Sequence, residues 1–269
     1  AVNYQISITN YRLPISFSYS SLKTFATCPY QYYLAYVIKV PIKGKATFSY
    51  GKTMHLTLQK FFSLILEQKK LAQNNLFAPA NQTPTTSLPT LEQLLKLYEE
   101  SWFDDWYETK IQKEQYKKQG RESLKIIYGQ LQTQTPRVIA VEKKFNFKIG
   151  NYIIKGVIDR IDEPTPGKIE LIDYKTGAAK NEKTVEKDQL LIYQIATTES
   201  LNLMPNQLTY YYLDDNTSLS FLGKAEDLTK IKEKITALIK QISARNFTAT
   251  PSEFTCSYCD FKSICPYRA

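Results

Sequence analysis

The sequence lacks any apolar run long enough to span a membrane, and it shows no signal peptide. We therefore expect a cytoplasmic protein without a membrane partner. Cysteine is scarce, with four residues, and cysteines in the cytoplasm are more typical of metal ligands than of disulfides. The sequence begins at Ala1 and so has no initiator methionine. We therefore expect a fragment that forms the terminal domain of a larger protein.

A complete ATP-binding loop is missing as well. The sequence Gly51-Lys52-Thr53 imitates the end of a phosphate-binding loop, which needs a second glycine five residues before Gly51. That position is Ala46, and no strand is expected to lead into it. We therefore reject ATP binding at this segment, and no helicase motif occurs in the 269 residues.

Positive charge is in excess. The chain has 35 Lys and Arg against 26 Asp and Glu, which gives a formal net charge of +9. Such an excess favours a polyanionic partner, and nucleic acid is the commonest one for a soluble basic protein. The 20 tyrosines and 13 phenylalanines could stack on unpaired bases, although most of them should lie in the core.

The pattern with the clearest chemistry occupies two segments, 156–162 and 169–177, which read GVIDRID and IELIDYKTG. They are expected to form adjacent strands joined by a proline-containing turn. Residues two apart on a strand point to the same face, so Asp173 and Lys175 can face one site. Asp159 can reach that site from the neighbouring strand. Two carboxylates can hold a hard divalent cation, and a lysine beside them can orient or deprotonate a water.

This arrangement resembles the PD-(D/E)XK nuclease superfamily, and most closely its RecB-like and AddB-like exonuclease branch, some members of which carry an iron–sulfur cluster. The family's Asp and Asp-x-Lys motifs fall on Asp159, Asp173 and Lys175. Its Gln-x-x-x-Tyr helix motif falls on Gln189 and Tyr193, which are one helical turn apart. The alternative for this pair is an exposed glutamine and a tyrosine that only packs in the core. The resemblance implies an α/β fold with a restriction-endonuclease-like core, in which helices flank a central mixed β-sheet.

The same resemblance implies the metal ligands of a Mg²⁺- or Mn²⁺-dependent site. His55, the only histidine, matches the histidine of the family's Gly-x-x-x-His helix opening. The backbone carbonyl of Tyr174 often completes such a site in the family, together with the two aspartates. Glu142 lies on the strand expected before the first motif. It is either a supporting carboxylate or an ordinary edge charge, and the second interpretation is favoured.

The four cysteines form a split pattern, with Cys28 near one end of the chain and Cys256, Cys259 and Cys265 in the tail at 247–269. Three cysteines this close, with little apolar sequence around them, suggest a bound metal centre. The split pattern is similar to that of the iron–sulfur nucleases of the family, and it implies a [4Fe–4S] cluster with a structural role. Structural zinc and free thiols remain the alternatives.

The expected domain organisation is a lead-in or linker at residues 1–17 followed by one nuclease domain at 18–269. This domain would contain a loop and helical insertion at 70–135 and the cluster-binding tail. The charges of a helix expected at 109–132 are interpreted as a solvated face rather than as contacts to DNA.

The favoured function is a DNA exonuclease of recombination and repair that acts on single-stranded DNA or DNA ends beside a helicase domain or subunit. A CRISPR-adaptation nuclease shares both the site and the cysteine pattern. A catalytically silent DNA-end-binding module is a third possibility, against which the retained metal ligands argue.

Overall fold

The computed structural model describes residues 14–73 and 88–269. They form a mixed α/β protein that divides into two compact units. Unit 1 comprises residues 1–43, 145–156 and 223–269, and unit 2 comprises residues 44–144 and 157–222. Two of the boundaries between the units fall within long paired strands, β2 (Val138–Ile149) and β3 (Tyr152–Thr165).

The sheet begins with β1 (Ser16–Phe17), β2 and β3, and its other three strands belong to unit 2, together with the two longest helices. In chain order the elements that lie wholly in unit 2 are α3 (Ala46–Gln73), α4 (Leu91–Glu100), α5 (Lys110–Thr133), β4 (Lys168–Lys175), α6 (Asp188–Ser200), β5 (Pro205–Tyr212) and β6 (Thr217–Phe221). The loop expected from residue 70 starts later, because α3 continues to Gln73. Residues 74–87 of that expected loop lie outside the described residues.

The sheet is mixed, as the sequence predicted. Its order is β1-β3-β4-β5-β6, with β2 paired to β3. Strands β3 and β4 are antiparallel, β4 and β5 are parallel, and β5 and β6 are antiparallel. The parallel pair needs a crossover connection, and α6 supplies it between β4 and β5.

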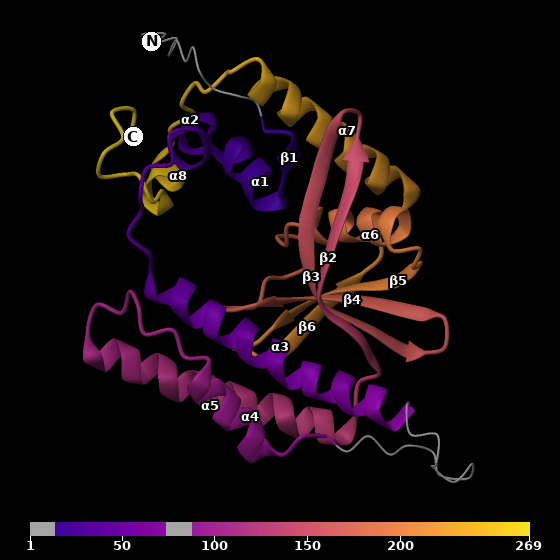
Figure 1. Cartoon of the computed structure of the whole chain (residues 1–269). Coiled ribbons are helices and arrows are strands. Elements are labelled where there is room, and N and C mark those ends of the chain that lie inside the picture. Colours follow the sequence, from indigo (N-terminus) through magenta and orange to yellow (C-terminus); the bar gives the residue numbers. More distant parts are fainter. Residues whose placement is uncertain (1–13, 74–87) are drawn as a thin grey trace. The chain divides into compact units, whose positions relative to one another are not determined.

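Successive side chains of β4 point to opposite faces of the sheet, and helices pack against both faces. Ile172 and Tyr174 belong to a buried cluster with apolar residues of α3, α4 and α5. On α3 these apolar residues recur at helical spacing, as Tyr50, Met54, Leu58, Phe61, Phe62 and Ile65. Asp173 points to the other face and meets side chains of α6. Figure 1 shows α3, α4 and α5 as neighbouring helices, and their mutual contacts agree.

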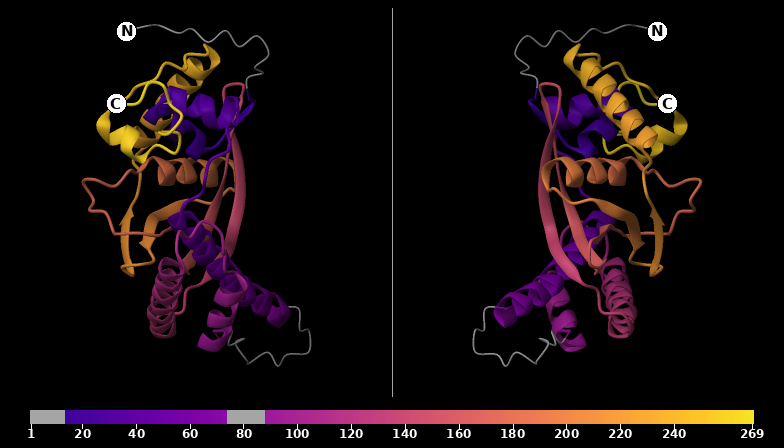
Figure 2. Two further views of the ribbon diagram at one scale, coloured as in Figure 1. Left: turned by 90° about the vertical axis from the view of Figure 1, so that its left-hand side faces the viewer. Right: turned by 90° about the vertical axis from the view of Figure 1, so that its right-hand side faces the viewer.

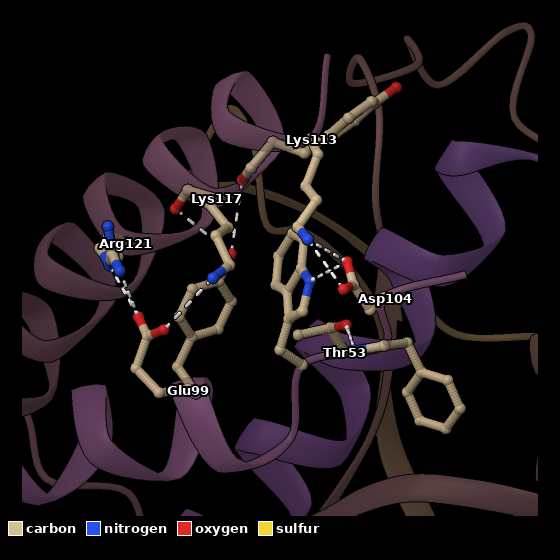
Figure 3. Close-up of polar contacts among 10 residues, drawn as sticks. Thr53, Glu99, Asp104, Lys113, Lys117 and Arg121 are labelled. Atoms are coloured by element: carbon tan, nitrogen blue, oxygen red, sulfur yellow. Dashed lines mark hydrogen bonds and ion pairs between the residues drawn. The ribbon is translucent and has the colours of Figure 1, made fainter. Parts of the chain in front are cut away.

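Polar contacts join α4 and the segment that follows it to α5. Arg121 Nη2 lies 2.7 Å from Glu99 Oε1, and Lys113 Nζ lies 2.6 Å from Asp104 Oδ1. Lys117 Nζ lies 3.8 Å from the other oxygen of Glu99, and Figure 3 shows all three basic side chains turned toward these acids. The expected solvated face of α5 is therefore partly engaged in intramolecular ion pairs.

Unit 1 brings the two ends of the described chain together. Its elements are β1 (Ser16–Phe17), α1 (Tyr19–Thr27), α2 (Pro29–Tyr32), a short π-helix η1 (Tyr33–Val37), α7 (Ala225–Ser243) and α8 (Glu253–Tyr258). Both views in Figure 2 show the indigo N-terminal helices gathered with the yellow C-terminal segment. Helix α1 contacts α7, which buries Ile231, Ile235, Ile239 and Ile242 along one stripe.

The break between α1 and α2 has a clear cause. Ser18 caps α1 through a reciprocal pair of hydrogen bonds with Ser21. Pro29 has no N–H and cannot continue a helix from within it, so it occupies the first turn of α2 instead. Cys28 lies between the two helices in an extended conformation, and this places its thiol at a helix junction.

Of the expected lead-in at 1–17, residues 1–13 lie outside the described residues, and Ser16–Phe17 form β1, which pairs in parallel with β3. Among the helices that the structure describes, none is both long and apolar enough to cross a membrane.

Candidate active site and cysteine centre

Strand pairing places the first two motifs side by side in unit 2. Arg160 on β3 is the register partner of Ile172 on β4, so Asp159 lies beside the residues that follow Ile172. The Asp159 carboxylate accepts a hydrogen bond from the backbone N–H of Tyr174 at 2.8 Å. The expected proximity of Asp159 to the end of β4 is therefore present, and a backbone contact holds the carboxylate in position.

His55 reaches the same carboxylate from α3. Its Nδ1 lies 3.4 Å from Oδ2 of Asp159, and its ring packs edge-on against the ring of Tyr174. Burial opposes protonation of the imidazole, but the hydrogen bond and charge of Asp159, with the charges of Asp173 and Glu142, outweigh it and raise the pKa of His55. The histidine therefore lies in a strongly negative environment, where a cation would be stabilised.

Glu142 belongs to this group, although the favoured interpretation was an ordinary edge charge. One ligand atom each from His55, Glu142 and Asp159 lies within 4.8 Å of the other two. Burial, followed by the charge of Asp159, raises the pKa of the Glu142 carboxyl, and His55 opposes this effect. The backbone of Glu142 has φ of 46°, a left-handed conformation that is uncommon for a residue with a side chain. Such conformations often occur at functional sites.

The sequence contained a signal for Glu142 that the motif comparison did not use. A two-residue turn at Gly150-Asn151 joins β2 to β3. In a regular hairpin with this turn, Ile149 lies opposite Tyr152. Seven residues further from the turn on each strand, Glu142 therefore lies opposite Asp159. The hairpin register, rather than any motif, therefore predicts their proximity.

Asp173 lies at the centre of a second set of contacts. It is 2% exposed, and its Oδ1 accepts hydrogen bonds from Gln189 Nε2 at 2.6 Å and from the Tyr193 hydroxyl at 3.2 Å. Burial, followed by the charge of Asp159, raises the pKa of Asp173 to about 6, while Lys175 opposes the increase. Gln189 and Tyr193 thus both face the candidate site from α6. Tyr193 is buried, but its hydroxyl donates to Asp173, so it does more than pack in the core.

Lys175 contacts both the acid and the amide of this set. Its Nζ donates to Gln189 Oε1 at 2.8 Å and lies 2.6 Å from Asp173 Oδ2. The second contact has no hydrogen-bond geometry, so Oδ2 is a buried oxygen without a hydrogen-bond partner. The ammonium of Lys175 compensates the charge of this oxygen, and no other group of the described residues contacts it by a hydrogen bond. The donor set therefore fits a cation that would share this oxygen.

Tyr174 has its side chain on the other face of the sheet. Arg160 Nη1 donates to its hydroxyl at 3.1 Å, and the guanidinium also lies over the ring of Phe62. Arg160 pairs with Asp162 at 3.0 Å, with both side chains largely buried. This buried pair supports Tyr174, whose backbone lies between Asp173 and Lys175.

Unit 1 contains the second candidate centre. Cys28, Cys256, Cys259 and Cys265 are all free thiols, and all four line one pocket. Tyr30, Leu34, Phe261 and Tyr267 form an apolar and aromatic part of the same wall. The N–H of Ala269 donates to Cys256 Sγ at 3.4 Å. Thiols that share one pocket wall are a donor set of the kind that metal centres with thiolate ligands use. In the described residues, however, no three of these sulfur atoms lie within 4.8 Å of one another.

Comparison with known proteins gives relatives that are much longer. A protein from Clostridium perfringens (strain SM101 / Type A), named as one subunit of an ATP-dependent helicase/deoxyribonuclease, is 26% identical over 264 residues, covering 84% of this chain and 22% of the relative. A protein of the same name from Streptococcus equi subsp. zooepidemicus (strain MGCS10565) is 26% identical over 174 residues, covering 61% of this chain and 14% of the relative. The chain therefore spans less than a quarter of the length of these curated relatives.

A solved structure and a family profile agree on the fold. The crystal structure of a protein from Eubacterium rectale, described as a candidate exonuclease, aligns with a TM-score of 0.51 over 93% of this chain and 87% of that chain. At 12% identity this similarity concerns the fold alone. The profile of the PD-(D/E)XK nuclease superfamily matches residues 16–266. Since this match covers almost all of the described chain, the protein belongs to the PD-(D/E)XK nuclease superfamily.

Proposed function

We propose that the protein is a metal-dependent deoxyribonuclease that degrades single-stranded DNA from its ends. The observation that carries the proposal is the grouping of His55, Glu142 and Asp159 next to the pair formed by Asp173 and Lys175. Carboxylate oxygens are the protein ligands that Mg²⁺ and Mn²⁺ prefer, and the imidazole nitrogen of His55 adds one further donor. The retained donors argue against a catalytically silent DNA-end-binding module.

In this proposal His55, Asp159 and Asp173 hold the cation, with the Tyr174 carbonyl as a further ligand. Glu142 is added to this set on the basis of its distance from His55 and Asp159. Asp173 remains in the set because its carboxylate is buried close enough to Asp159 for that charge to raise its pKa, and its Oδ2 has Lys175 as its one charged contact among the described residues. When bound, the cation supplies Lewis acidity, which polarises a phosphoryl oxygen and lowers the pKa of water.

The other side chains act on the nucleophile and on the substrate. Lys175 orients the attacking water or stabilises the negative charge that develops on the phosphate. Gln189 fixes the Lys175 ammonium by accepting its hydrogen bond, and with Tyr193 it holds one oxygen of Asp173 in position. These groups are suited to contacts with the phosphate backbone and read no base, so cleavage should be largely independent of sequence.

The cysteine pocket of unit 1 is proposed to hold a [4Fe–4S] cluster. Its ligands would be the four thiols that line it, which come from the two ends of the described chain. A centre with such ligands would join these ends and stabilise unit 1. Structural zinc is the competing occupant, and metal analysis of anaerobically purified protein separates them: iron and sulfide support the cluster, and one zinc contradicts it.

A helicase is the proposed partner. The curated relatives are named as helicase/deoxyribonuclease subunits, and this chain corresponds to a small part of their length. A motor that separates the strands would deliver single-stranded DNA to the site in unit 2.

The experiment that tests the proposal is digestion of linear and circular single-stranded DNA by anaerobically purified protein with Mg²⁺ or Mn²⁺. Loss of the linear DNA alone supports the exonuclease. Loss of both forms contradicts the requirement for an end. If neither is cut by a folded protein with its metal centre present, either alone or with a helicase partner, the protein is a DNA-binding module.

A further inference from the structure

The net positive charge is confined to one of the two units. Within the described residues of unit 1 (14–43, 145–156 and 223–269), 13 Lys and Arg face 5 Asp and Glu. Within those of unit 2 (44–73, 88–144 and 157–222), the two counts are equal at 21. The electrostatic attraction for a polyanion therefore comes from the unit that carries the cysteines rather than from the unit that carries the candidate active site.

Unit 1 also contains a groove between α1 and α8. It is lined by Tyr19, Ser20, Lys23, Thr24, Thr27, Gln31, Phe254, Thr255, Tyr258 and Cys259. Its volume is about 480 Å³. Pockets that bury a drug-sized ligand hold roughly 300–1,000 Å³, so a nucleotide unit fits.

Two aromatic side chains of this groove are strongly exposed. Phe254 is 77% exposed and Tyr258 is 71% exposed. They are one turn apart on α8, so they lie on the same face of the helix, and their ring centroids are 5.3 Å apart. Neither ring contributes much buried area to the fold, and neighbouring exposed aromatics rimmed by polar side chains are typical of a binding surface.

The rim of the groove supplies groups that suit a phosphate backbone. Lys23 lies on the α1 side, with its Nζ 5.6 Å from the centroid of the Tyr19 ring. Hydroxyl groups line the same side, from Ser20, Thr24 and Thr27. Exposed aromatics with a cation and hydroxyl groups are the combination by which proteins bind single strands without reading their sequence. Lys23 is the one basic side chain among the residues that line the groove, so the wider basic excess of unit 1 adds long-range attraction for a polyanion.

We propose that this groove is an accessory binding site for single-stranded nucleic acid, in which bases stack on Phe254 and Tyr258 while Lys23 approaches a phosphate. The proposal rests on the nuclease function proposed above, because it supplies the strand that such an enzyme would cut. It places an anchor for the strand in unit 1, outside the candidate active site.

The test measures binding without cleavage. Full-length protein with its metal centre is titrated against fluorescein-labelled oligo-dT without divalent cations, and anisotropy gives the Kd. The double variant Phe254→Ala/Tyr258→Ala is expected to bind at least about 10-fold more weakly, because stacking on an aromatic side chain contributes strongly for each base. Ile264→Ala is the matched control, since Ile264 is 57% exposed in the same tail but does not line the groove.

An abasic oligonucleotide of the same length separates stacking from charge. Wild type and double variant should bind it with equal affinity, whereas Lys23→Gln should reduce the slope of log Kd against log salt by about 0.7. Iron content is measured for every variant, since Cys259 lines both the groove and the cysteine pocket. An unchanged Kd for oligo-dT, or an equal loss on the abasic strand, overturns the proposal.

Hydrolysis of bis(p-nitrophenyl) phosphate with Mn²⁺ keeps this proposal distinct from the nuclease proposal. This small diester needs no groove, so the double variant should hydrolyse it at the wild-type rate. If the wild type binds oligo-dT through the groove but hydrolyses neither the diester nor DNA, the groove stands and the nuclease assignment fails. If wild type and double variant hydrolyse the diester equally and also bind oligo-dT equally, the groove assignment fails alone.

Discussion

The imidazole of His55 lies 3.4 Å from the carboxylate of Asp159, although one residue belongs to a helix and the other to a strand. The contact depends on the packing of α3 against the sheet, where its apolar residues join the core that contains Ile172 and Tyr174. A stable helix–sheet core therefore sets the geometry of the proposed metal site. Substitutions at the site and in its supporting contacts should consequently have separable effects on activity and stability.

Lys175→Ala should lower the rate of DNA cleavage by about 10²- to 10³-fold while the fold is retained. The side chain is about one-third exposed, at 35%, so its loss leaves no large cavity, but it removes the cation nearest to Asp173. Loss of a group that stabilises developing charge lowers kcat by an amount of this size. Single-turnover cleavage and thermal unfolding measure the two effects, and a fully active variant would refute the proposed role.

Glu142→Gln should weaken Mn²⁺ binding by about 10- to 100-fold, in the range seen when a group that supports a metal site is removed. The substitution preserves the size of the side chain but removes one of the three grouped ligand atoms. Electron paramagnetic resonance of free Mn²⁺ gives the affinity. Glu163→Gln is the control, because Glu163 pairs with Arg137 outside this group. Equal Mn²⁺ affinity in the wild type and in Glu142→Gln would show that Glu142 is an edge charge and does not bind the metal.

Asp162→Ala should lower the free energy of unfolding by about 3–5 kcal/mol, because it leaves the guanidinium of Arg160 buried without its acidic partner. The exposed pair of Arg137 and Glu163 provides the comparison, since Arg137 is 54% exposed. Breaking that pair with Glu163→Ala should cost about 1 kcal/mol or less. Urea unfolding measures the free energy of unfolding of both variants. An equal loss in the two would show that the buried pair stabilises the protein no more than the exposed pair does.

Two glycines of α5 should respond to alanine in opposite directions. A Cβ at Gly120 would lie 2.4 Å from the Tyr98 hydroxyl oxygen, whereas a Cβ at Gly129 has no neighbour within 4 Å. Gly129→Ala should stabilise the protein by up to about 1 kcal/mol, since alanine favours a helix over glycine. Gly120→Ala should destabilise it, because Tyr98 is buried and has little room to move. Thermal unfolding of the two variants provides the measurement.

If unit 1 holds the proposed [4Fe–4S] cluster, Cys256→Ser should remove most of its iron and lower the melting temperature of unit 1. The thiol is one of four that line the pocket, and a hydroxyl is a poor replacement for a thiolate ligand. Iron analysis and the visible absorption of the protein report the cluster, and calorimetry reports stability. A variant that keeps its iron and its melting temperature would contradict a cluster that joins the two ends of the described chain.

Much of the fold, and the grouping of most residues of the candidate site, could be predicted from the sequence, because strand alternation and motif spacing are local properties. Asp173 and Lys175 required only the two-residue period of one strand, and Gln189 and Tyr193 only one helical turn. Glu142 was interpreted as an edge charge because no motif marks it, although the hairpin register places it opposite Asp159. Its left-handed backbone conformation could not be predicted from the sequence. The ion pairs of Lys113 with Asp104 and of Arg121 with Glu99 were not predicted, since the orientation of one helix against another is not a local property of the sequence.

The central claim is that the His55–Glu142–Asp159 group holds the cation that supports cleavage. The most direct test is the rate of linear single-stranded DNA digestion against Mg²⁺ concentration for the wild type and for Asp159→Asn. The wild type should require Mg²⁺ and saturate with it, while Asp159→Asn, with an unchanged melting temperature, should show no cleavage at any concentration. Cleavage by the wild type in excess chelator, or a wild-type rate in Asp159→Asn, would contradict the claim.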